Sequence, residues 1–118
     1  MTAVNTLGPG MIIDVHAGRP VLSNRVGGVS GTALRPVAVR CVYELAANVD
    51  IPIIGVGGVL DGEDAVQMLM AGATAVGVGS ALEVYGDGAF QRILKGLEDL
   101  MISEGYDLLD DFRGCAHG

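Results

Sequence analysis

The sequence predicts an α/β fold with a parallel sheet, and three observations lead to this prediction. Short apolar runs alternate along the chain with segments of helical periodicity. The apolar runs of the second half lack polar alternation, which is typical of parallel strands buried on both faces. Glycine pairs follow these runs directly, as expected where a strand turns into a helix. The resulting order is strand, hairpin, helix, strand, helix, strand, helix.

The first residues predict a strand and a hairpin. Residues 2–6 are expected to form a short strand, and residues 7–10 (LGPG) carry the composition of a turn. Residues 11–15 and 20–23 flank the four residues 16–19, so we expect a hairpin with its loop there.

A glycine-rich segment and a helix follow the hairpin. Residues 27–31 (GGVSG) carry too little side chain to pack, so they predict a loop. Residues 33–47 predict a helix, and Pro36 lies in its first turn, where a missing N–H is harmless. The apolar positions on one face of this helix are Val39, Val42, Tyr43 and Ala46.

The second half predicts two strands and two helices. Residues 51–56 (IPIIGV) and 75–78 (AVGV) are expected to be buried strands. Asp61 suits the N-cap of a helix with an acidic first turn, and Gly72 suits its C-terminal end. The last helix is expected over residues 89–103, with apolar side chains at helical spacing.

Three core strands cannot close a barrel, and a complete (β/α)₈ barrel takes about 250 residues. The 118 residues therefore form either a small open sheet or a part of a larger barrel. The residue pattern alone leaves both open, and residues 1–118 are treated as one unit.

The composition excludes several classes of function. Seven basic and 14 acidic residues give a net charge of −7 without a basic patch, so binding to nucleic acid or an anionic membrane is not expected. No apolar run reaches the length that spans a bilayer. With two cysteines and no secretory signal, we expect a cytoplasmic protein. Glycine makes up 19 of 118 residues, about twice the usual share, which indicates loops that approach a ligand with their backbone.

Two of the glycine pairs point to a phosphate site. Gly57-Gly58 and Gly79-Ser80 each follow a predicted strand, at the edge of the sheet where α/β folds bind ligands. Their backbone N–H groups, the Ser80 hydroxyl and the N-termini of the following helices suit a phosphate. The alternative is that these are tight turns which need glycine for packing, but two pairs one βαβ unit apart favour phosphate binding.

Three further sets of candidate binding residues are less well supported when each is considered alone. Gly31 and its neighbours could lie flat against a planar ring or a phosphate, or could form a flexible loop. Asn5 and Thr6, at the end of a strand, could bind a polar substrate or simply form a turn. Arg25 and Arg35 flank the glycine loop and could meet an anion, or could be ordinary solvated arginines.

No catalytic or metal-binding constellation can be assembled. His16 is expected to be a solvated residue at the hairpin tip, and Cys41 a packing residue within a helix. Cys115 and His117 lie in a tail that we expect to be frayed, after an acidic segment. We therefore predict no catalytic residue and no metal site on this chain.

Eight short motifs follow one another along the chain. They are NTL (5–7), GMIID (10–14), RPVLSNR (19–25), GGVSG (27–31), RPVA (35–38), IPIIGVGG (51–58), AGA (71–73) and GVGS (77–80). Together they resemble the dihydroorotate dehydrogenase family across nearly the whole chain. The resemblance implies the C-terminal portion of a (β/α)₈ TIM barrel, about strands 6–8 with their helices plus a β-hairpin insertion. It also implies FMN-dependent oxidation of dihydroorotate to orotate in de novo pyrimidine biosynthesis.

The resemblance assigns roles to particular residues. By it, Val4 and Gly31 contact the flavin, and Asn5 and Thr6 bind the substrate. The groups that hold the FMN phosphate would be Gly57, Gly58, Gly79 and Ser80. The family's catalytic base and its flavin-contacting lysine lie upstream of these motifs, and Lys95 cannot replace that lysine. The isolated chain is therefore expected to be inactive.

The resemblance also implies partners. They are dihydroorotate or orotate, the missing N-terminal half of the barrel, and an iron–sulfur FAD electron-transfer subunit of the NAD-linked branch (class 1B), in a homo- or hetero-oligomer. Two alternatives stay open. One is a non-catalytic FMN- or phosphate-binding half-barrel. The other is a dihydropyrimidine dehydrogenase-like flavoenzyme, because Thr32 stands where the family commonly has proline.

Overall fold

The computed structural model describes residues 1–118, with a three-stranded parallel sheet at its centre. The sheet consists of β1 (Thr2–Ala3), β6 (Ile54–Val56) and β7 (Ala75–Gly77), in that order. Both pairings are parallel. The predicted α/β architecture with a parallel sheet is confirmed, although each strand is shorter than its apolar run.

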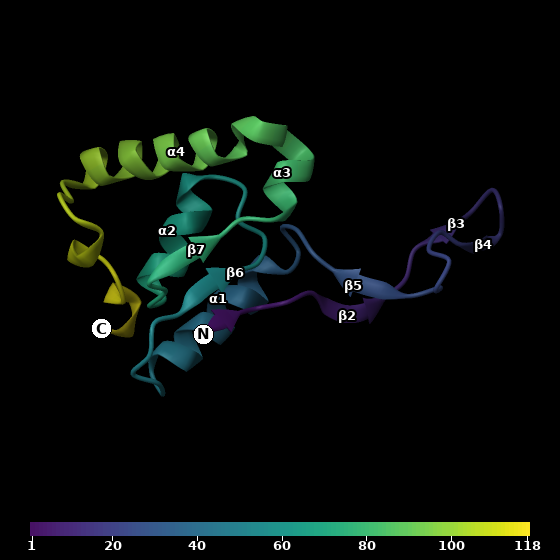
Figure 1. Cartoon of the computed structure of the whole chain (residues 1–118), viewed down its shortest axis with the longest axis horizontal. Helices are drawn as coiled ribbons and strands as arrows, with labels where there is room; N and C mark the ends of the chain where they lie inside the picture. Colours follow the sequence, from purple (N-terminus) through teal and green to yellow (C-terminus); the bar gives the residue numbers. More distant parts are fainter.

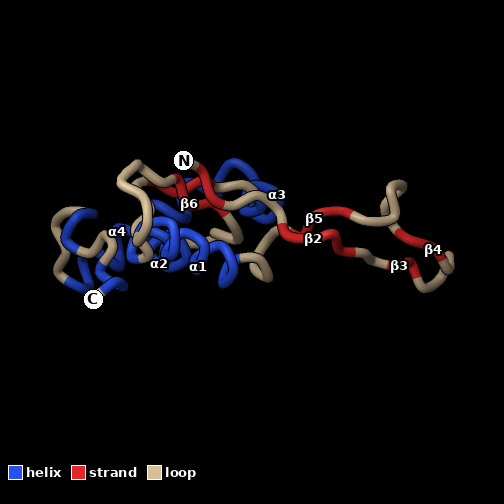
Figure 2. Tube along the Cα trace, turned by 90° about the horizontal axis from the view of Figure 1, so that it is seen from below, coloured by secondary structure: helices blue, strands red, loops and turns tan.

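Helices cover one face of this sheet. Figures 1 and 2 show α1 (Arg35–Ala46) and α2 (Gly62–Met70) on the same side of the strands, with α4 (Ala89–Glu104) crossing α2. The backbone of α4 lies against Gly62 so closely that no side chain would fit there, which fixes how the two helices cross. Asp61 caps α2 as predicted, since its Oδ1 accepts the N–H of Asp64 at 3.0 Å.

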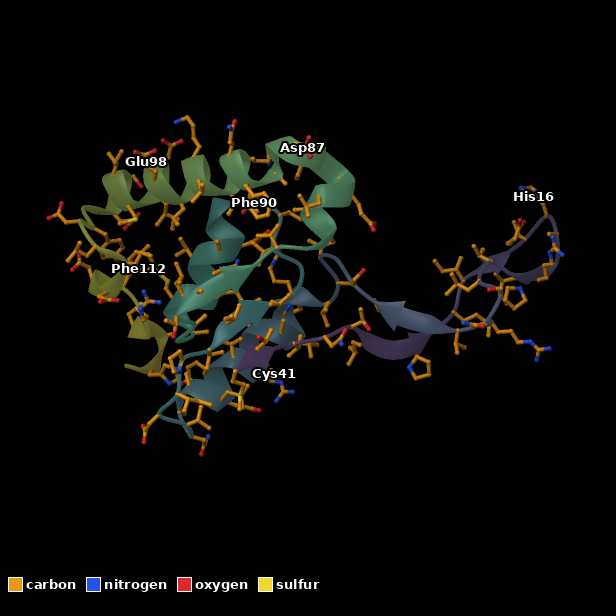
Figure 3. All side chains as sticks on the ribbon, in the orientation of Figure 1. His16, Cys41, Asp87, Phe90, Glu98 and Phe112 are labelled. Carbon is orange, nitrogen blue, oxygen red and sulfur yellow. The ribbon has the colours of Figure 1, made fainter.

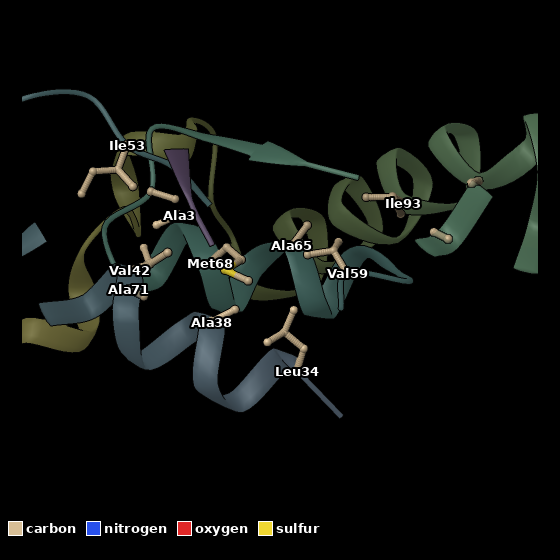
Figure 4. Close-up of a cluster of buried hydrophobic side chains, with 13 residues drawn as sticks. Ala3, Leu34, Ala38, Val42, Ile53, Val59, Ala65, Met68, Ala71 and Ile93 are labelled. Carbon is tan, nitrogen blue, oxygen red and sulfur yellow. The ribbon is translucent and has the colours of Figure 1, made fainter. Parts of the chain in front are cut away.

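A core of small apolar side chains joins the helices to the sheet (Figure 4). Ala38 and Val42 on α1 and Met68 on α2 are completely buried, and Ile53 at the entry to β6 is 2% exposed. Seven of its 13 buried members are alanines: Ala3, Ala38, Ala65, Ala71, Ala73, Ala81 and Ala89. Small side chains let α1 and α2 approach the strands closely.

The opposite face of the sheet is bare. The register places Thr2, Ile54 and Ala75 side by side on that face, and all three are exposed, Ile54 at 42%. The prediction that these strands are buried on both faces is wrong for this chain, because none of its 118 residues covers the second face.

Residues 7–29 form a long arm that projects from the body (Figure 1). β2 (Leu7–Gly10) pairs antiparallel with β5 (Gly27–Val29), and β3 (Ile13–Asp14) pairs with β4 (Arg19–Pro20) nearer the tip. The predicted turn at 7–10 and loop at 27–31 are therefore wrong in large part. Both segments pair through their backbones, and this pairing does not require bulky side chains.

The predicted hairpin is confirmed, with its loop one residue earlier, at 15–18. Asp14 ends the first strand, because its Oδ1 accepts the N–H groups of His16 at 2.9 Å and Ala17 at 3.0 Å. His16 lies exposed at the tip of the arm, as predicted (Figure 3).

The helix predictions are confirmed with one omission and one wrong face residue. α1 and α4 begin and end within two residues of the predicted bounds. A six-residue helix, α3 (Ser80–Tyr85), and a 3₁₀ turn, η1 (Gly86–Gly88), precede α4 and were not predicted. Val42 is buried on α1, but Tyr43 is 39% exposed and packs against the tail instead.

The C-terminal tail is docked, so the prediction of a frayed end is wrong. Short 3₁₀ turns η2 (Leu109–Asp111) and η3 (Cys115–His117) fold it back onto the body. Phe112 is 1% exposed and packs with Val66 and Leu69 of α2. The ring of His117 stacks on Tyr43 at 4.0 Å between centroids, and its Nε2 lies 2.9 Å from the carbonyl oxygen of Ala71. None of the helices combines the length and apolarity needed to cross a bilayer.

Replacing Phe112 by alanine should destabilise the chain, because it removes the buried aromatic ring that holds the tail on α2. We expect a loss of about 3 kcal/mol in the free energy of unfolding, measured by urea denaturation. The control is Ile102→Ala, at a position 72% exposed on α4, which should cost less than about 0.5 kcal/mol. Equal losses in the two variants would contradict the docked tail.

Candidate functional site

One pocket of about 180 Å³ lies where the strands of the parallel sheet end. It is formed by the segments that follow β1, β6 and β7, together with the segment that precedes α1. All eight predicted site residues line it: Val4, Asn5, Thr6, Gly31, Gly57, Gly58, Gly79 and Ser80. Residues from four separate parts of the sequence therefore converge on one place, as the position of their motifs after the strands predicted.

The pocket begins where β1 leaves the sheet. The N–H of Val4 donates to the carbonyl oxygen of Val56 at 2.8 Å, which continues the pairing of β1 with β6 by one residue. Asn5 and Thr6 follow and are exposed. The Oδ1 of Asn5 accepts the N–H of Thr6 at 2.7 Å, so the amide is held by the backbone and its NH₂ group is left to donate.

Gly57 and Gly58 make a turn that only glycine fits. Their φ angles are 142° and 70°, a conformation that other residues rarely adopt. A Cβ on Gly57 would lie 2.6 Å from the Cβ of Ala38, and one on Gly58 would lie 2.5 Å from the carbonyl oxygen of Gly31. The packing explanation of this pair is thus correct, and it does not compete with binding, because the same turn lines the pocket.

Several donors in the pocket have no partner within the chain. The backbone N–H groups of Gly57, Gly58 and Gly79 form no hydrogen bond there, and neither does the Ser80 hydroxyl. No atom lies within 4 Å of a Cβ position on Gly31 or Gly79, so both glycines border open space. The pocket can therefore offer neutral N–H and O–H donors to an oxygen-rich group.

The expected help from the helix after Gly57-Gly58 stays a prediction, and no residue of α2 lines the pocket. Two carboxylates occupy the start of α2: Asp61 caps it, and the Oδ2 of Asp64 accepts the N–H of Leu60 at 3.0 Å. Arg35 does contact an anion, but this anion is the carboxylate of Asp64 in the same chain. The Nη1 of Arg35 lies 2.6 Å from the Oδ1 of Asp64. Sequence reasoning missed this pairing because 29 positions separate the two residues.

The lining contains no ionisable side chain. Its five members that were not predicted are Ser30, Leu34, Val56, Val59 and Gly77. Three of them, Ser30, Val56 and Gly77, belong to glycine-containing motifs that were visible in the sequence. At neutral pH such a lining can bind and orient a molecule but offers no acid or base. No group of three or more His, Cys, Asp or Glu residues in the chain is placed to hold a metal ion.

The groups with a clearly shifted pKa lie away from the pocket. A hydrogen bond to Asp99 raises the pKa of Lys95 on α4, and one to Glu44 raises the pKa of Arg40 on α1. Both side chains are exposed, and neither lines the pocket. Cys41 is half-buried and also lies outside it.

Comparison with known proteins agrees with the motifs. Residues 1–101 match the family described as dihydroorotate dehydrogenase. The chain is 54% identical over 117 residues to a protein of Methanothermobacter thermautotrophicus, covering 99% of this chain and 39% of the relative. It is 52% identical over 118 residues to a Methanosarcina mazei protein (99% and 37%) and 43% identical over 116 residues to a Pyrococcus furiosus protein (98% and 38%).

All three relatives are named dihydroorotate dehydrogenase B (NAD(+)), catalytic subunit. The chain spans about two fifths of the length of these curated relatives. With 101 of its 118 residues matched by the family, the chain belongs to the dihydroorotate dehydrogenase family.

Proposed function

We propose that this chain is the C-terminal part of an FMN-dependent dihydroorotate dehydrogenase, which oxidises dihydroorotate to orotate in pyrimidine biosynthesis. The observation that carries the proposal is the convergence of all eight predicted residues on one pocket at the carboxyl ends of parallel strands. In this proposal residues 1–118 form one unit, about strands 6–8 of a (β/α)₈ barrel with their helices and the projecting arm. The remaining strands belong to an N-terminal part.

The surface of the chain supports a partial barrel. In a (β/α)₈ barrel the face of the sheet away from the helices is the packed interior, and here that face bears the exposed Thr2, Ile54 and Ala75. The outer helices of such a barrel also pack on their neighbours. On α4 the apolar side chains of Leu94 and Ile102 are 62% and 72% exposed, as expected of a helix that lacks a neighbour.

The pocket fits the cofactor that we propose. A phosphate needs several hydrogen-bond donors, and the unpartnered N–H groups of Gly57, Gly58 and Gly79 and the Ser80 hydroxyl supply them. Gly31 borders open space, which leaves room for a planar ring, and Val4 adds an apolar wall. When bound, FMN supplies the hydride acceptor for the oxidation. The residues of this chain contribute by holding the reacting molecules in place.

Asn5 and Thr6 are the proposed substrate contacts. The free NH₂ of Asn5 can donate to a carbonyl or carboxylate oxygen, and the Thr6 hydroxyl can donate or accept. Because no ionisable group lines the pocket, we assign the proton-removing base to the N-terminal part. The names of the relatives, which specify a catalytic subunit and NAD(+), support an electron-transfer partner, for which we propose an iron–sulfur FAD subunit in a cytoplasmic complex.

Assembly with an N-terminal part tests the whole proposal. Co-expressing this chain with the N-terminal part of the Methanothermobacter relative should give a yellow complex that oxidises dihydroorotate. The chain alone should associate through its bare sheet face and exposed strand edges, as measured by light scattering. A monodisperse, cooperatively unfolding monomer that yields no yellow complex would contradict the proposal.

The same preparations separate the alternatives. Quenching of flavin fluorescence by the isolated chain at micromolar concentration would favour the non-catalytic half-barrel. Oxidation of a dihydropyrimidine in preference to dihydroorotate would favour the dihydropyrimidine dehydrogenase-like enzyme.

Replacing Gly79 by aspartate should weaken FMN binding by the complex about tenfold or more, because the new carboxylate enters open space beside the phosphate donors. Gly88→Asp is the matched control, since Gly88 also borders open space but lies outside the pocket, and its affinity should not change. Gly57 is a poor position for this test, because any side chain there collides with Ala38. Equal affinities of the two variants would refute the phosphate site.

Replacing Asn5 by alanine should raise the KM for dihydroorotate about tenfold, through the loss of one or two hydrogen bonds to the substrate. The flavin content of the complex should stay unchanged, because Asn5 is assigned to substrate alone. Steady-state kinetics with absorbance of the bound flavin measure both quantities. A variant that loses flavin but keeps its KM would show that Asn5 serves the cofactor instead.

A further inference from the structure

An ion pair lies directly behind the glycine turn of the pocket. The Nη1 of Arg35, on α1, is 2.6 Å from the Oδ1 of Asp64, on α2. The side chain of Asp64 is only 7% exposed, and Asp64 is the one charged residue buried in the chain. The other three ion pairs each join exposed carboxylates to cations three or four positions away on one segment: Arg40–Glu44, Lys95–Asp99 and Arg113–Asp110.

The same two side chains hold the backbone that leads out of the turn. Arg35 Nη1 donates to the carbonyl oxygen of Gly58 at 3.4 Å, and Asp64 Oδ2 accepts the N–H of Leu60 at 3.0 Å. A trans peptide directs its N–H opposite to its carbonyl, so the Arg35 contact turns the N–H of Val59 to the other side of the chain. Val59 lines the pocket, and its N–H has no partner within the chain.

A buried pair of this kind is not explained by stability alone. Replacing a buried ion pair by apolar side chains of similar volume is often neutral or stabilising, because charges lose their hydration on burial. Gly57 and Gly58, by contrast, have the most conformational freedom of any residue type and need external contacts to stay in one conformation. The contacts of Arg35 and Asp64 with the backbone after the turn can restrict it to one conformation.

Electrostatics gives the pair a second effect. An unpaired Asp64 carboxylate behind the turn would repel an anion in the pocket, and Arg35 neutralises it at 2.6 Å. Because the charges cancel within the pair, the N–H donors of the turn face the pocket without a negative charge behind them.

We propose that Arg35 and Asp64 are positioning residues that fix the Gly57–Gly58 turn for the phosphate group of the cofactor and cancel the negative charge behind it. The inference rests on the proposed function, since it takes this turn as a phosphate site. Neither side chain touches the phosphate itself, because neither lines the pocket.

The test compares two flavins that differ only in the phosphate. FMN and riboflavin are titrated into the flavin-free complex of this chain with its N-terminal part, and their Kd values are measured by fluorescence quenching. Arg35→Gln, which leaves the Asp64 carboxylate unpaired behind the turn, should weaken FMN binding about tenfold or more while changing riboflavin binding less than about twofold. Adding Asp64→Asn to Arg35→Gln removes that carboxylate and should recover part of the lost FMN affinity. Arg35→Lys, which keeps the charge, should lose less FMN affinity than Arg35→Gln.

Arg40→Gln is the matched control, because Arg40 lies on the same helix, pairs with Glu44 at 2.6 Å and is remote from the turn. It should leave both Kd values unchanged. A wild-type complex that binds FMN no better than riboflavin would overturn the phosphate site and the inference together. A wild-type preference for FMN that survives in Arg35→Gln, or losses that are equal for the two flavins, would overturn only the positioning role.

Discussion

The contact between α1 and the turn after β6 is the constraint on which the rest of the structure depends. Gly57 lies against the Cβ of Ala38 and Gly58 lies against the carbonyl oxygen of Gly31, so neither glycine has room for a side chain. This contact brings the end of β6 against α1 and the loop that precedes α1, which lie about 20 positions earlier in the sequence. The pocket exists because the glycine turn reaches these segments without side chains of its own, and its N–H groups have no partner within the chain.

The same close packing explains why only one face of the sheet is covered by helices. Because Gly62 has no side chain, the backbone of α4 packs directly against α2, just as α1 packs directly against Gly57. The helices therefore lie close to one another and to one face of the sheet. The core that results is made of short side chains and does not extend through the sheet. The other face of the sheet bears Ile54 in solvent, and in larger α/β folds further strands or helices cover such a face, which connects the fold to the proposed partial barrel.

Local signals in the sequence were sufficient for the elements and contacts that are themselves local. Asp61 caps α2 through a bond to the residue three positions on, and the pocket residues stand at fixed offsets from strand ends. Long-range pairings could not be predicted in this way. The LGPG segment has the composition of a turn, but it becomes a strand because residues 27–29 are available to pair with it. Phe112 docks on Val66, 46 positions away, and no local pattern indicates its partner.

The proposed binding site shows the same division. The sequence indicates the glycines of the pocket directly. It gives no sign of the pairing of Arg35 with Asp64, because an arginine and an acid in the first turn of a helix are usually solvated, and only the fold brings these two together. Only the three-dimensional structure therefore distinguishes the residues that form the turn from those that hold it in place.

The acidic character of the chain makes the composition of the pocket informative. A net charge of −7 opposes the approach of a phosphate, and this repulsion is screened beyond about 8 Å at physiological salt. What decides binding is therefore the arrangement within the pocket, from which all 14 acidic side chains are absent. The one carboxylate that lies buried behind it is paired with Arg35. An acidic chain can accommodate an anion in this way, by binding it through neutral backbone donors and by cancelling the nearest negative charge internally.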